Sequence, residues 1–308
     1  MASTTADDIV FEYPPFIRVY KDGRKERLRE DVFVAASVDP STGVSSKDVV
    51  IQPETGLSAR MYLPKGANPK TKLPLVIYYH GGGFCIESAF CPTYHNYLNL
   101  LVSKANVVAV SVDYRRAPEY PLPIAYEDSW TALKWVFSHP DEEWLTKYAD
   151  YDRVYMAGDS AGGNISHNMA VRAHIEPNNF KFKGIVLAHP YFIGSTPLAS
   201  EGDMDLLGKL WLAVYPTTSG LDDPLVNPFK DPNFSKVACK RVLVCVAGLD
   251  VLVHRGKHYH ENLGKCGWEG VLEFTETEAE PHVFHVSTPE IENASKLMEQ
   301  VVAFLNAP

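Results

Sequence analysis

Short, almost uninterrupted apolar runs limit the possible folds of this chain more than any other feature. Such runs are typical of parallel strands that are covered on both faces of a sheet. Between them lie segments of helical length, with apolar residues at spacings of three and four. This alternation predicts a doubly wound α/β fold, with a mostly parallel central sheet and helices on both faces. The expected strands are 75–79, 107–112, 154–157, 184–188 and 242–246, and the expected helices are 93–104, 124–138, 160–174, 203–214, 254–266 and 289–305.

The chain before the first of these strands has a different pattern. Residues 48–51 and 58–63 flank a short turn, and the second run alternates as a half-buried antiparallel strand does. Nearer the N-terminus, residues 16–20 and 24–28 flank Lys21-Asp22-Gly23, and Asp-Gly suits the positive φ angles of a tight hairpin turn. We therefore expect antiparallel strands at the start of the sheet, preceded by a short N-terminal ribbon.

The charge balance and the cysteines exclude several classes of protein. Lys plus Arg minus Asp plus Glu is 29 − 38 = −9, without a basic stripe, so nucleic acid and anionic membranes are not expected partners. The five cysteines are odd in number and form no CxxC pair, as is typical of reduced thiols in a cytosol-like compartment. The start, MASTTADDIV, does not resemble a signal peptide, and no run approaches the ~18 apolar residues of a membrane span. We expect a soluble, unprocessed cytoplasmic protein, with the nucleus as a second location.

The segment Gly158-Asp159-Ser160-Ala161-Gly162 matches the pattern GxSxG, which alone often arises by chance. Here it follows an expected strand and precedes a helical segment, and that strand, sharp turn and helix would lift Ser Oγ clear of the sheet edge. A side chain at either glycine would crowd the neighbouring strand and helix. The pattern predicts that Ser160 is a nucleophile, with a helix-capping serine as the alternative.

A glycine-rich loop, HGGGF at residues 80–84, follows the expected strand 75–79. Successive glycines leave backbone N–H groups free to point at a developing oxyanion. With GxSxG downstream, this type of loop is expected to complete an oxyanion hole together with the N–H of Ala161. A merely flexible glycine loop is the alternative.

A serine nucleophile needs a histidine to accept its proton and an acid to orient that histidine. In an α/β fold of this kind the acid and then the histidine follow the serine along the chain. Asp250 lies just past the expected strand 242–246, at a carboxyl strand end, although it could also cap a helix. His282 follows the expected strand 271–274, and His285 is a rival that chain order alone does not exclude.

Other histidines are expected to lie on a solvated helix face (His254, His258 and His260) or to orient loops (His80 and His189). His254, His258 and His260 include a pair at i and i+4, but no HExxH glutamate accompanies them, so neither a metal site nor a cofactor is expected. His80 and His189 follow apolar strands, and we expect them to orient loops by hydrogen bonds.

The motifs together resemble the hormone-sensitive-lipase type of α/β-hydrolase over nearly the whole chain. The resemblance rests on HGGGF at 80–84, DYRRAPEYPLP at 113–123, GDSAGGN at 158–164, AGLD at 247–250 and PHVF at 281–284. Segments 17–28 and 39–51 are similar to the plant carboxylesterase branch, near 2-hydroxyisoflavanone dehydratase and the cyclases of monoterpene indole alkaloid pathways.

The resemblance implies roles for individual residues. It favours His282 over His285, because the family pattern is His, any residue, Phe. The implied catalytic residues are Ser160, Asp250 and His282, and the implied oxyanion donors are Gly81, Gly82 and Ala161.

The resemblance also implies how the substrate site is covered. One α/β-hydrolase domain over residues 1–308 would carry an N-terminal cap, about residues 1–45, and a second cap element, about residues 195–232. Phe84, Tyr114 and Tyr191 are candidate substrate contacts because they lie beside motifs at strand ends, although each could equally be ordinary core.

The intact set of site residues favours ester hydrolysis among the activities of this family. Gibberellin receptors of this fold lack the catalytic histidine, which is present here as His282. Isoflavanone dehydratases are associated with Thr in place of the nucleophilic serine and with an altered third glycine in the oxyanion loop, whereas this chain has Ser160 and Gly83 at these positions. We expect a carboxylesterase for a small ester of plant specialised metabolism, such as alkaloid biosynthesis, acting as a monomer or homodimer. A dehydratase or cyclase using the same pocket is the alternative, and a non-catalytic hormone receptor is a third.

Overall fold

The computed structural model describes residues 8–138, 141–176, 179–199 and 201–308. Its central strands are β4 (Ser45–Gln52), β5 (Leu57–Leu63), β6 (Leu73–Tyr79), β7 (Val108–Asp113), β8 (Ala149–Asp159), β9 (Gly184–Ala188), β10 (Arg241–Ala247) and β11 (Val271–Thr277). They form one eight-stranded sheet in the order β11-β10-β9-β8-β6-β7-β5-β4. Strand β5 pairs antiparallel with β4 and β7, and every other pair is parallel. The mostly parallel sheet is as predicted, and β8, which precedes Ser160, lies near its middle.

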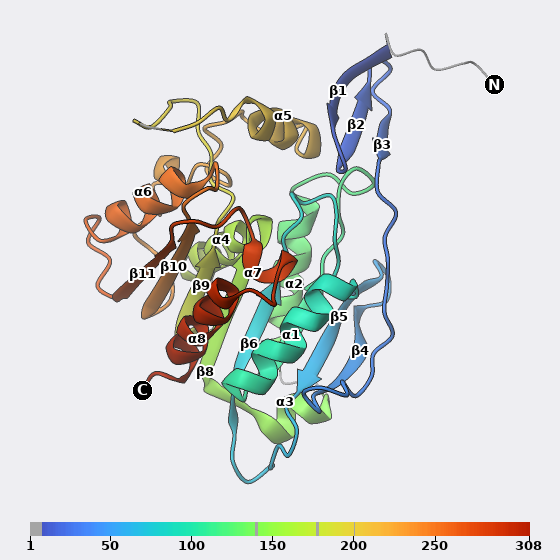
Figure 1. Cartoon of the computed structure of the whole chain (residues 1–308), viewed down its shortest axis with the longest axis vertical. Helices are drawn as coiled ribbons and strands as arrows, with labels where there is room; N and C mark the ends of the chain where they lie inside the picture. The colour runs from blue at the N-terminus through green and yellow to red at the C-terminus, as the bar shows by residue number, and fades with distance from the viewer. Residues whose placement is uncertain (1–7, 139–140, 177–178, 200) are drawn as a thin grey trace, which may run out of the picture.

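Helices cover both faces of this sheet (Figure 1). One face carries α1 (Pro92–Ala105) and α8 (Glu292–Asn306), and the other carries α2 (Ile124–Phe137), α4 (Ala161–Ile175) and α6 (Val253–Leu263). Strand β6 is apolar throughout because both of its faces are buried. Ile77 and Tyr79 belong to one cluster of buried residues, and Val76 and Tyr78 belong to the other. Because successive strand residues point to opposite faces, a strand covered on both sides needs apolar residues at every position.

The predicted helices and strands are all present, with boundaries within a few residues. Two short helices, α3 (Glu143–Tyr148) and α7 (Phe284–Ser287), were not predicted. With six and four residues respectively, they are too short to show a helical period in the sequence.

A separate three-stranded antiparallel sheet is formed by β1 (Ile9–Tyr13), β2 (Ile17–Tyr20) and β3 (Lys25–Arg27). The predicted turn between β2 and β3 is present, with Gly23 at a φ of 83° and its N–H donating to Tyr20 O at 3.0 Å. Strand β1 was not predicted; it adds to the free edge of β2.

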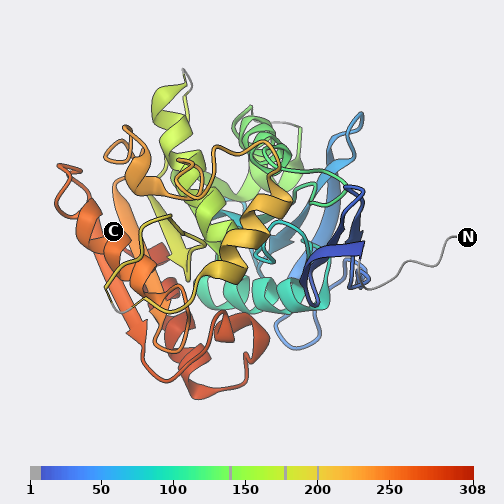
Figure 2. The same ribbon diagram turned by 90° about the horizontal axis from the view of Figure 1, so that it is seen from above.

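This small sheet and helix α5 (Asp205–Val214) lie together above the carboxyl ends of the central strands (Figure 1). Figure 2 shows both elements from above, with α5 in gold beside the dark blue strands. The ammonium group of Lys25 donates to Ala213 O at 2.6 Å and so links the two. Of the predicted cap segments, residues 1–7 and residue 200 lie outside the described residues.

The chain between α5 and β10 is irregular apart from one 3₁₀ turn, Pro228–Lys230. It is nevertheless anchored, because Leu225 O accepts hydrogen bonds from the side-chain amides of Asn164 and Asn168 on α4 at 2.7 and 3.0 Å. No helix in the described part of the chain is both long enough and apolar enough to cross a bilayer.

Candidate active site

Ser160 occupies a sharp turn between β8 and α4, with φ 50° and ψ −115°. A non-glycine residue with this backbone conformation is strained and persists when its surroundings hold it in place. Here the Ser160 N–H donates to Ala188 O at 2.9 Å, and a Cβ atom at Gly162 would overlap the carbonyl oxygen of Tyr79. At Gly158 a Cβ atom would overlap the backbone of Gly162. The glycines therefore let the turn approach the sheet closely, with Ser160 placed at the lining of the cavity.

The structure brings Ser160, His282 and Asp250 together, although 90 residues separate Ser160 from Asp250. The Oγ atom of Ser160 lies 2.9 Å from His282 Nε2, and His282 Nδ1 lies 2.6 Å from Asp250 Oδ2. The other carboxylate oxygen of Asp250 accepts the N–H of Leu252 at 2.9 Å. The Asp250 side chain is 1% exposed and that of His282 is 34% exposed, so the acid is buried beneath a histidine that faces the cavity.

His189 holds the loop that carries His282. Its Nδ1 atom accepts the N–H of Val283 at 2.9 Å, and Val283 has a φ of 50°. Burial, together with the neighbouring His285 and His282, lowers the pKa of His189 well below its ordinary value, so the ring stays neutral and can accept this bond. The expectation that His189 orients a loop by a hydrogen bond is confirmed.

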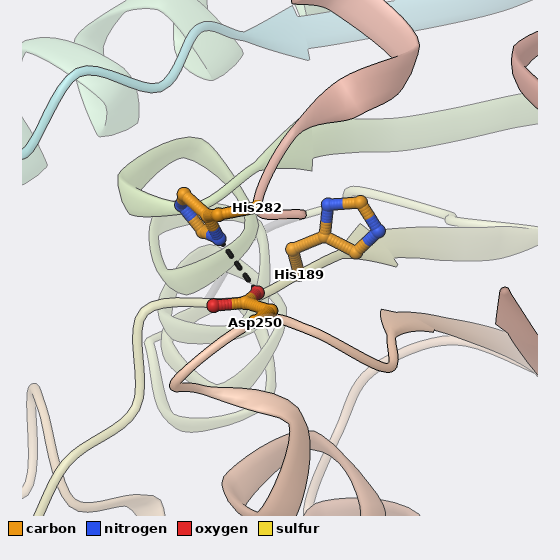
Figure 3. A group of neighbouring side chains, drawn as sticks. All are labelled: His189, Asp250 and His282. Carbon is orange, nitrogen blue, oxygen red and sulfur yellow. Dashed lines mark hydrogen bonds and ion pairs between the residues drawn. The ribbon is translucent and has the colours of Figure 1, made fainter. Parts of the chain in front are cut away.

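Figure 3 shows His189 beside Asp250 and His282, with the dashed line joining the latter two. Their possible ligand atoms lie within 4.8 Å of one another, which is close enough to consider a metal ion. The Nδ1 atom of His189 already takes a backbone N–H, and Asp250 already accepts two hydrogen bonds. The arrangement therefore fits a hydrogen-bonded acid and base better than a set of free ligands.

His285, the rival to His282, lies three residues further along the chain, in α7. It is buried, packs edge-on against Tyr97 and His189, and has no hydrogen-bond partner for either ring nitrogen among the described residues. Burial lowers its pKa to about 3, so it is an uncharged packing residue at neutral pH.

In the glycine-rich loop, Gly82 and Gly83 have φ angles of 99° and 57° and line the cavity together with Ser160. No hydrogen-bond partner for their N–H groups lies within the described residues. Ala161 is the first residue of α4, where a helix leaves its N–H groups without intrahelical partners. Gly81 differs, because its N–H donates to the hydroxyl of Tyr94 at 2.7 Å and is engaged there.

Tyr114 supports the same loop from below. Its hydroxyl donates to His80 O at 2.7 Å, and its ring stacks on that of His80 with centroids 4.2 Å apart. The Nδ1 atom of His80 lies 2.8 Å from Gly81 O, and burial lowers the pKa of His80 to about 3. The expectation that His80 orients a loop is thus confirmed, and Tyr114 lies outside the cavity lining.

A cavity of about 430 Å³ lies directly above Ser160 and His282. Most of the side chains around it are apolar, and Tyr191 is among them, as the sequence suggested. Phe84 is absent from the lining and packs into the core against Tyr126 and Trp211. The main lining side chains are Tyr13, Phe16, Ile86, Tyr191, Leu207, Leu210, Val251, Leu252, Val283 and Val286.

Four of these lining residues come from the segments above the sheet, and sequence reasoning did not single them out. Tyr13 and Phe16 belong to the small sheet and its turn, where their rings stack with centroids 4.6 Å apart. Leu207 and Leu210 come from α5. No motif marks such positions, because apolar contact with a substrate requires no particular residue at a particular spacing.

The structure also concentrates strained backbone around this site. Six non-glycine residues have positive φ angles in the described part of the chain. One of them, Asn106, is the C-cap residue of α1 and does not line the cavity. One of the other five is Ser160 itself. Phe84 and Glu87 follow the glycines of the glycine-rich loop, Val283 follows His282, and His189 accepts the N–H of Val283. Strain of this kind is typical of positions that must place a functional group accurately.

The fold and this arrangement agree with the comparisons with known proteins. A family described as having the alpha/beta hydrolase fold matches residues 76–286, which is more than half of the chain. The chain therefore belongs to the α/β-hydrolase fold family.

Similar proteins cover almost the full length of the chain. It is 44% identical to "Probable carboxylesterase 2" of Arabidopsis thaliana over 98% of each protein. It is 45% identical to the "2-hydroxyisoflavanone dehydratase" of Glycyrrhiza echinata, over 99% of this chain and 98% of that protein. A solved hyperthermophilic esterase from Pyrobaculum calidifontis is 29% identical, superposes with a TM-score of 0.72 and covers 85% of each chain.

Proposed function

We propose that this protein is a serine carboxylesterase that hydrolyses a small ester through an acyl-enzyme. The observation that carries the proposal is the hydrogen-bonded series Ser160 Oγ, His282 Nε2, His282 Nδ1 and Asp250 Oδ2 at the floor of an apolar cavity. Esterases among the similar sequences and structures support the same class of reaction.

In the first half of the proposed reaction, Ser160 Oγ attacks the ester carbonyl while His282 Nε2 accepts its proton. Asp250 keeps His282 in the tautomer whose Nε2 can accept, and stabilises the imidazolium that forms. The protonated His282 then donates to the departing alcohol. In the second half, His282 takes a proton from the water that attacks the acyl group, and it returns this proton to Ser160 Oγ as the acyl–oxygen bond breaks and the acid leaves.

The oxyanion donors of this proposal differ from those implied by the sequence resemblance. Because the N–H of Gly81 is engaged by Tyr94, we assign the developing charge to the N–H groups of Gly82, Gly83 and Ala161. Gly83 therefore replaces Gly81 as a proposed donor, while Gly82 and Ala161 are retained.

The cavity supports a small and mainly apolar substrate. A volume of about 430 Å³ and apolar walls suit an ester whose acyl or alcohol part is aliphatic or aromatic. One ion pair, Arg29 Nη1 to Glu87 Oε1 at 2.7 Å, lies at the lining and offers polar contacts to a substituted substrate. We infer that the natural ester is a plant specialised metabolite, an acylated alkaloid being one candidate, because the similar full-length proteins are from plants.

A second candidate function is elimination or cyclisation of a plant metabolite in the same cavity. The similarity to a 2-hydroxyisoflavanone dehydratase favours it, and His282 would then act as a general base. Product analysis with 2-hydroxyisoflavanones and acetylated alkaloids separates the two, because elimination gives an alkene and hydrolysis gives an alcohol and an acid.

The esterase proposal is tested with para-nitrophenyl acetate and a fluorophosphonate probe. We expect the purified protein to turn over the ester and to be labelled on the peptide that contains Ser160, whereas Ser160→Ala should do neither. Activity of Ser160→Ala equal to that of the parent would disprove the proposal. Absence of labelling together with ligand-dependent binding of a partner protein would instead favour a receptor.

We also propose that the whole chain forms one domain, with residues 1–45 and 195–232 contributing the cap. Tyr13, Phe16, Leu207 and Leu210, which line the cavity, support this division. The five unpaired cysteines support a reducing compartment such as the cytoplasm, and the net charge of −9 argues against nucleic acid as a partner. Light scattering of the purified protein would distinguish a monomer from a homodimer.

A further inference from the structure

The hydroxyl of Tyr94 joins the turn of Ser160 to the glycine-rich loop. It accepts the N–H of Gly81 at 2.7 Å and donates to Asp159 Oδ2 at 2.7 Å. Asp159 immediately precedes Ser160, and Gly81 immediately precedes Gly82. Two short segments that come from different strands are thus connected through one phenolic oxygen of helix α1.

The three groups are buried, so water does not compete for these hydrogen bonds. Asp159 is 0% exposed and Tyr94 is 3% exposed. Burial, reinforced by the carboxylate of Asp159, raises the pKa of Tyr94 well above its ordinary value, so its hydroxyl keeps the proton that it donates. Burial raises the pKa of Asp159 to about 6, and the hydrogen bonds from the hydroxyls of Tyr78 and Tyr94 oppose this increase.

The contact is also tight. A Cβ atom at position 81 would overlap Asp159 Oδ2 and lie 2.8 Å from the hydroxyl of Tyr94, so the loop backbone passes directly against these two groups. The hydrogen bond at Gly81 N therefore fixes the peptide group between His80 and Gly81, which immediately precedes the peptide that carries the N–H of Gly82. A small shift of that peptide would move the N–H groups of Gly82 and Gly83, and displacements of this kind reduce catalysis strongly.

We infer that Tyr94 and Asp159 are positioning residues for the oxyanion hole, holding the glycine-rich loop at the correct distance from Ser160. The inference rests on the proposed esterase function. Neither side chain is required to touch the reacting atoms; Asp159 orients the Tyr94 hydroxyl, and that hydroxyl fixes Gly81.

Strand β6 provides a matched control for this inference. The hydroxyl of Tyr78 donates to the other carboxylate oxygen, Asp159 Oδ1, at the same 2.7 Å, and it is equally buried. Unlike Tyr94, Tyr78 makes no hydrogen bond to the loop in the described structure, and it does not line the cavity. Tyr78→Phe and Tyr94→Phe therefore each remove one hydroxyl from Asp159, but only the second releases Gly81.

The experiment compares these two variants with the parent on para-nitrophenyl acetate. For Tyr94→Phe we expect kcat to fall about tenfold to a hundredfold, with KM within about twofold, because the ring that lines the cavity remains. The affinity for a hexyl trifluoromethyl ketone, which forms an oxyanion on Ser160, should fall by a similar factor. For Tyr78→Phe we expect a comparable loss of thermal stability, but kcat and ketone affinity within about twofold of the parent.

Asp159→Asn tests the other half of the link. It should lower kcat, as Tyr94→Phe does. The double variant Tyr94→Phe/Asp159→Asn should have a kcat close to that of the less active single variant, because both changes release the same loop. Additive losses would contradict a shared path.

The inference is overturned if Tyr94→Phe retains the parent's kcat and ketone affinity, or if both tyrosine variants lose them equally. Neither result would affect the esterase proposal, provided that the parent hydrolyses the ester and Ser160→Ala does not. If Ser160→Ala is fully active, the esterase proposal itself fails. Circular dichroism of each variant at the assay temperature confirms that folded proteins are compared.

Discussion

The floor and the roof of the cavity are held in place by different interactions. The floor, formed by the loops of Ser160, His282 and the glycines 81–83, is fixed by strained backbone and by hydrogen bonds between buried ring side chains and backbone groups. The roof, formed by β1–β3 and α5, is attached to the rest of the molecule by hydrogen bonds of individual side chains, such as Arg27 to Ala117 O at 2.9 Å and Tyr191 to Leu207 O at 2.6 Å. The backbone that carries the proposed catalytic groups is thus held directly by buried groups, whereas the segments above the cavity are joined to the rest through individual side chains.

The largest effect is expected at the floor, for Asp250→Asn. The amide would favour the wrong tautomer of His282, so kcat should fall about ten-thousandfold with little change in KM. Steady-state kinetics on para-nitrophenyl acetate measures this. The matched control is Asp152→Asn, an exposed position near the opposite end of β8, which should retain the parent's kcat. A loss below about tenfold for Asp250→Asn would indicate that another group orients His282.

The next effect tests the buried contact at the base of the roof. Arg255 on α6 pairs with Glu201 at 2.8 Å, with both side chains at most 3% exposed, and also donates to Thr196 O ahead of α5. Removing one partner of a buried ion pair leaves the other uncompensated, so Glu201→Gln should lower the free energy of unfolding by about 3 kcal/mol. Urea denaturation measures the change.

The exposed pair on α8, Lys296 with Glu292, is the control for that experiment. Both side chains are more than half exposed, so Glu292→Gln should be indistinguishable from the parent. If Glu201→Gln were equally neutral, side-chain pairing would not be what holds the base of the roof.

The third prediction concerns the loop of His282. His189→Leu removes the acceptor for the Val283 N–H and should cost about 1–3 kcal/mol of unfolding free energy because that N–H is left unpaired. It should also lower kcat, since His282 loses its fixed position. His189→Gln offers a carbonyl oxygen instead and should recover part of both losses. Equal behaviour of the two variants would show that ring packing, and not the hydrogen bond, supports the loop.

A fourth and smaller effect is expected at the roof, for Phe16→Ala. The change removes one apolar wall of the cavity, so the ratio of KM for para-nitrophenyl hexanoate to KM for the acetate should rise about tenfold. The unfolding free energy should change less than it does for His189→Leu. An unchanged KM ratio would show that the longer acyl chain does not contact the roof.

The smallest effect is expected for the surface ion pair between Asp31 and Arg116, whose two hydrogen bonds are 2.8 and 2.9 Å long. Burial alone would raise the pKa of Asp31, but the hydrogen bond and charge of Arg116 outweigh it and lower the pKa below its ordinary value. A lowered pKa stabilises the fold above the unfolded pKa, near 4, and this contribution is lost as pH falls through the folded pKa.

Asp31→Asn should therefore cost about 0.5–1 kcal/mol at pH 7, since the pair is partly exposed, and the difference from the parent should vanish in acid. Denaturation midpoints at pH 7 and at progressively lower pH measure this. A difference that grew on acidification would contradict the assigned sign.

Sequence patterns predicted the floor of the site better than its roof. The strands of the central sheet, the major helices, the strained turn at Ser160 and the loop-orienting histidines His80 and His189 were all read from residue type and position. They were predictable because each depends on local constraints, such as glycine where a side chain would collide, or apolar residues where both faces of a strand are covered.

The sequence by itself determined the fold class, the order of the central strands and major helices, and the proposed catalytic residues Ser160, Asp250 and His282. Tertiary structure alone decided which peptide N–H groups remain free, since Gly81 is engaged by a tyrosine thirteen residues away on α1. It also decided that Phe84 and Tyr114 support the loop and core while Tyr13 and Leu210 reach the cavity. The physical reason is that these outcomes depend on contacts between distant segments, whose geometry no local spacing of residues specifies.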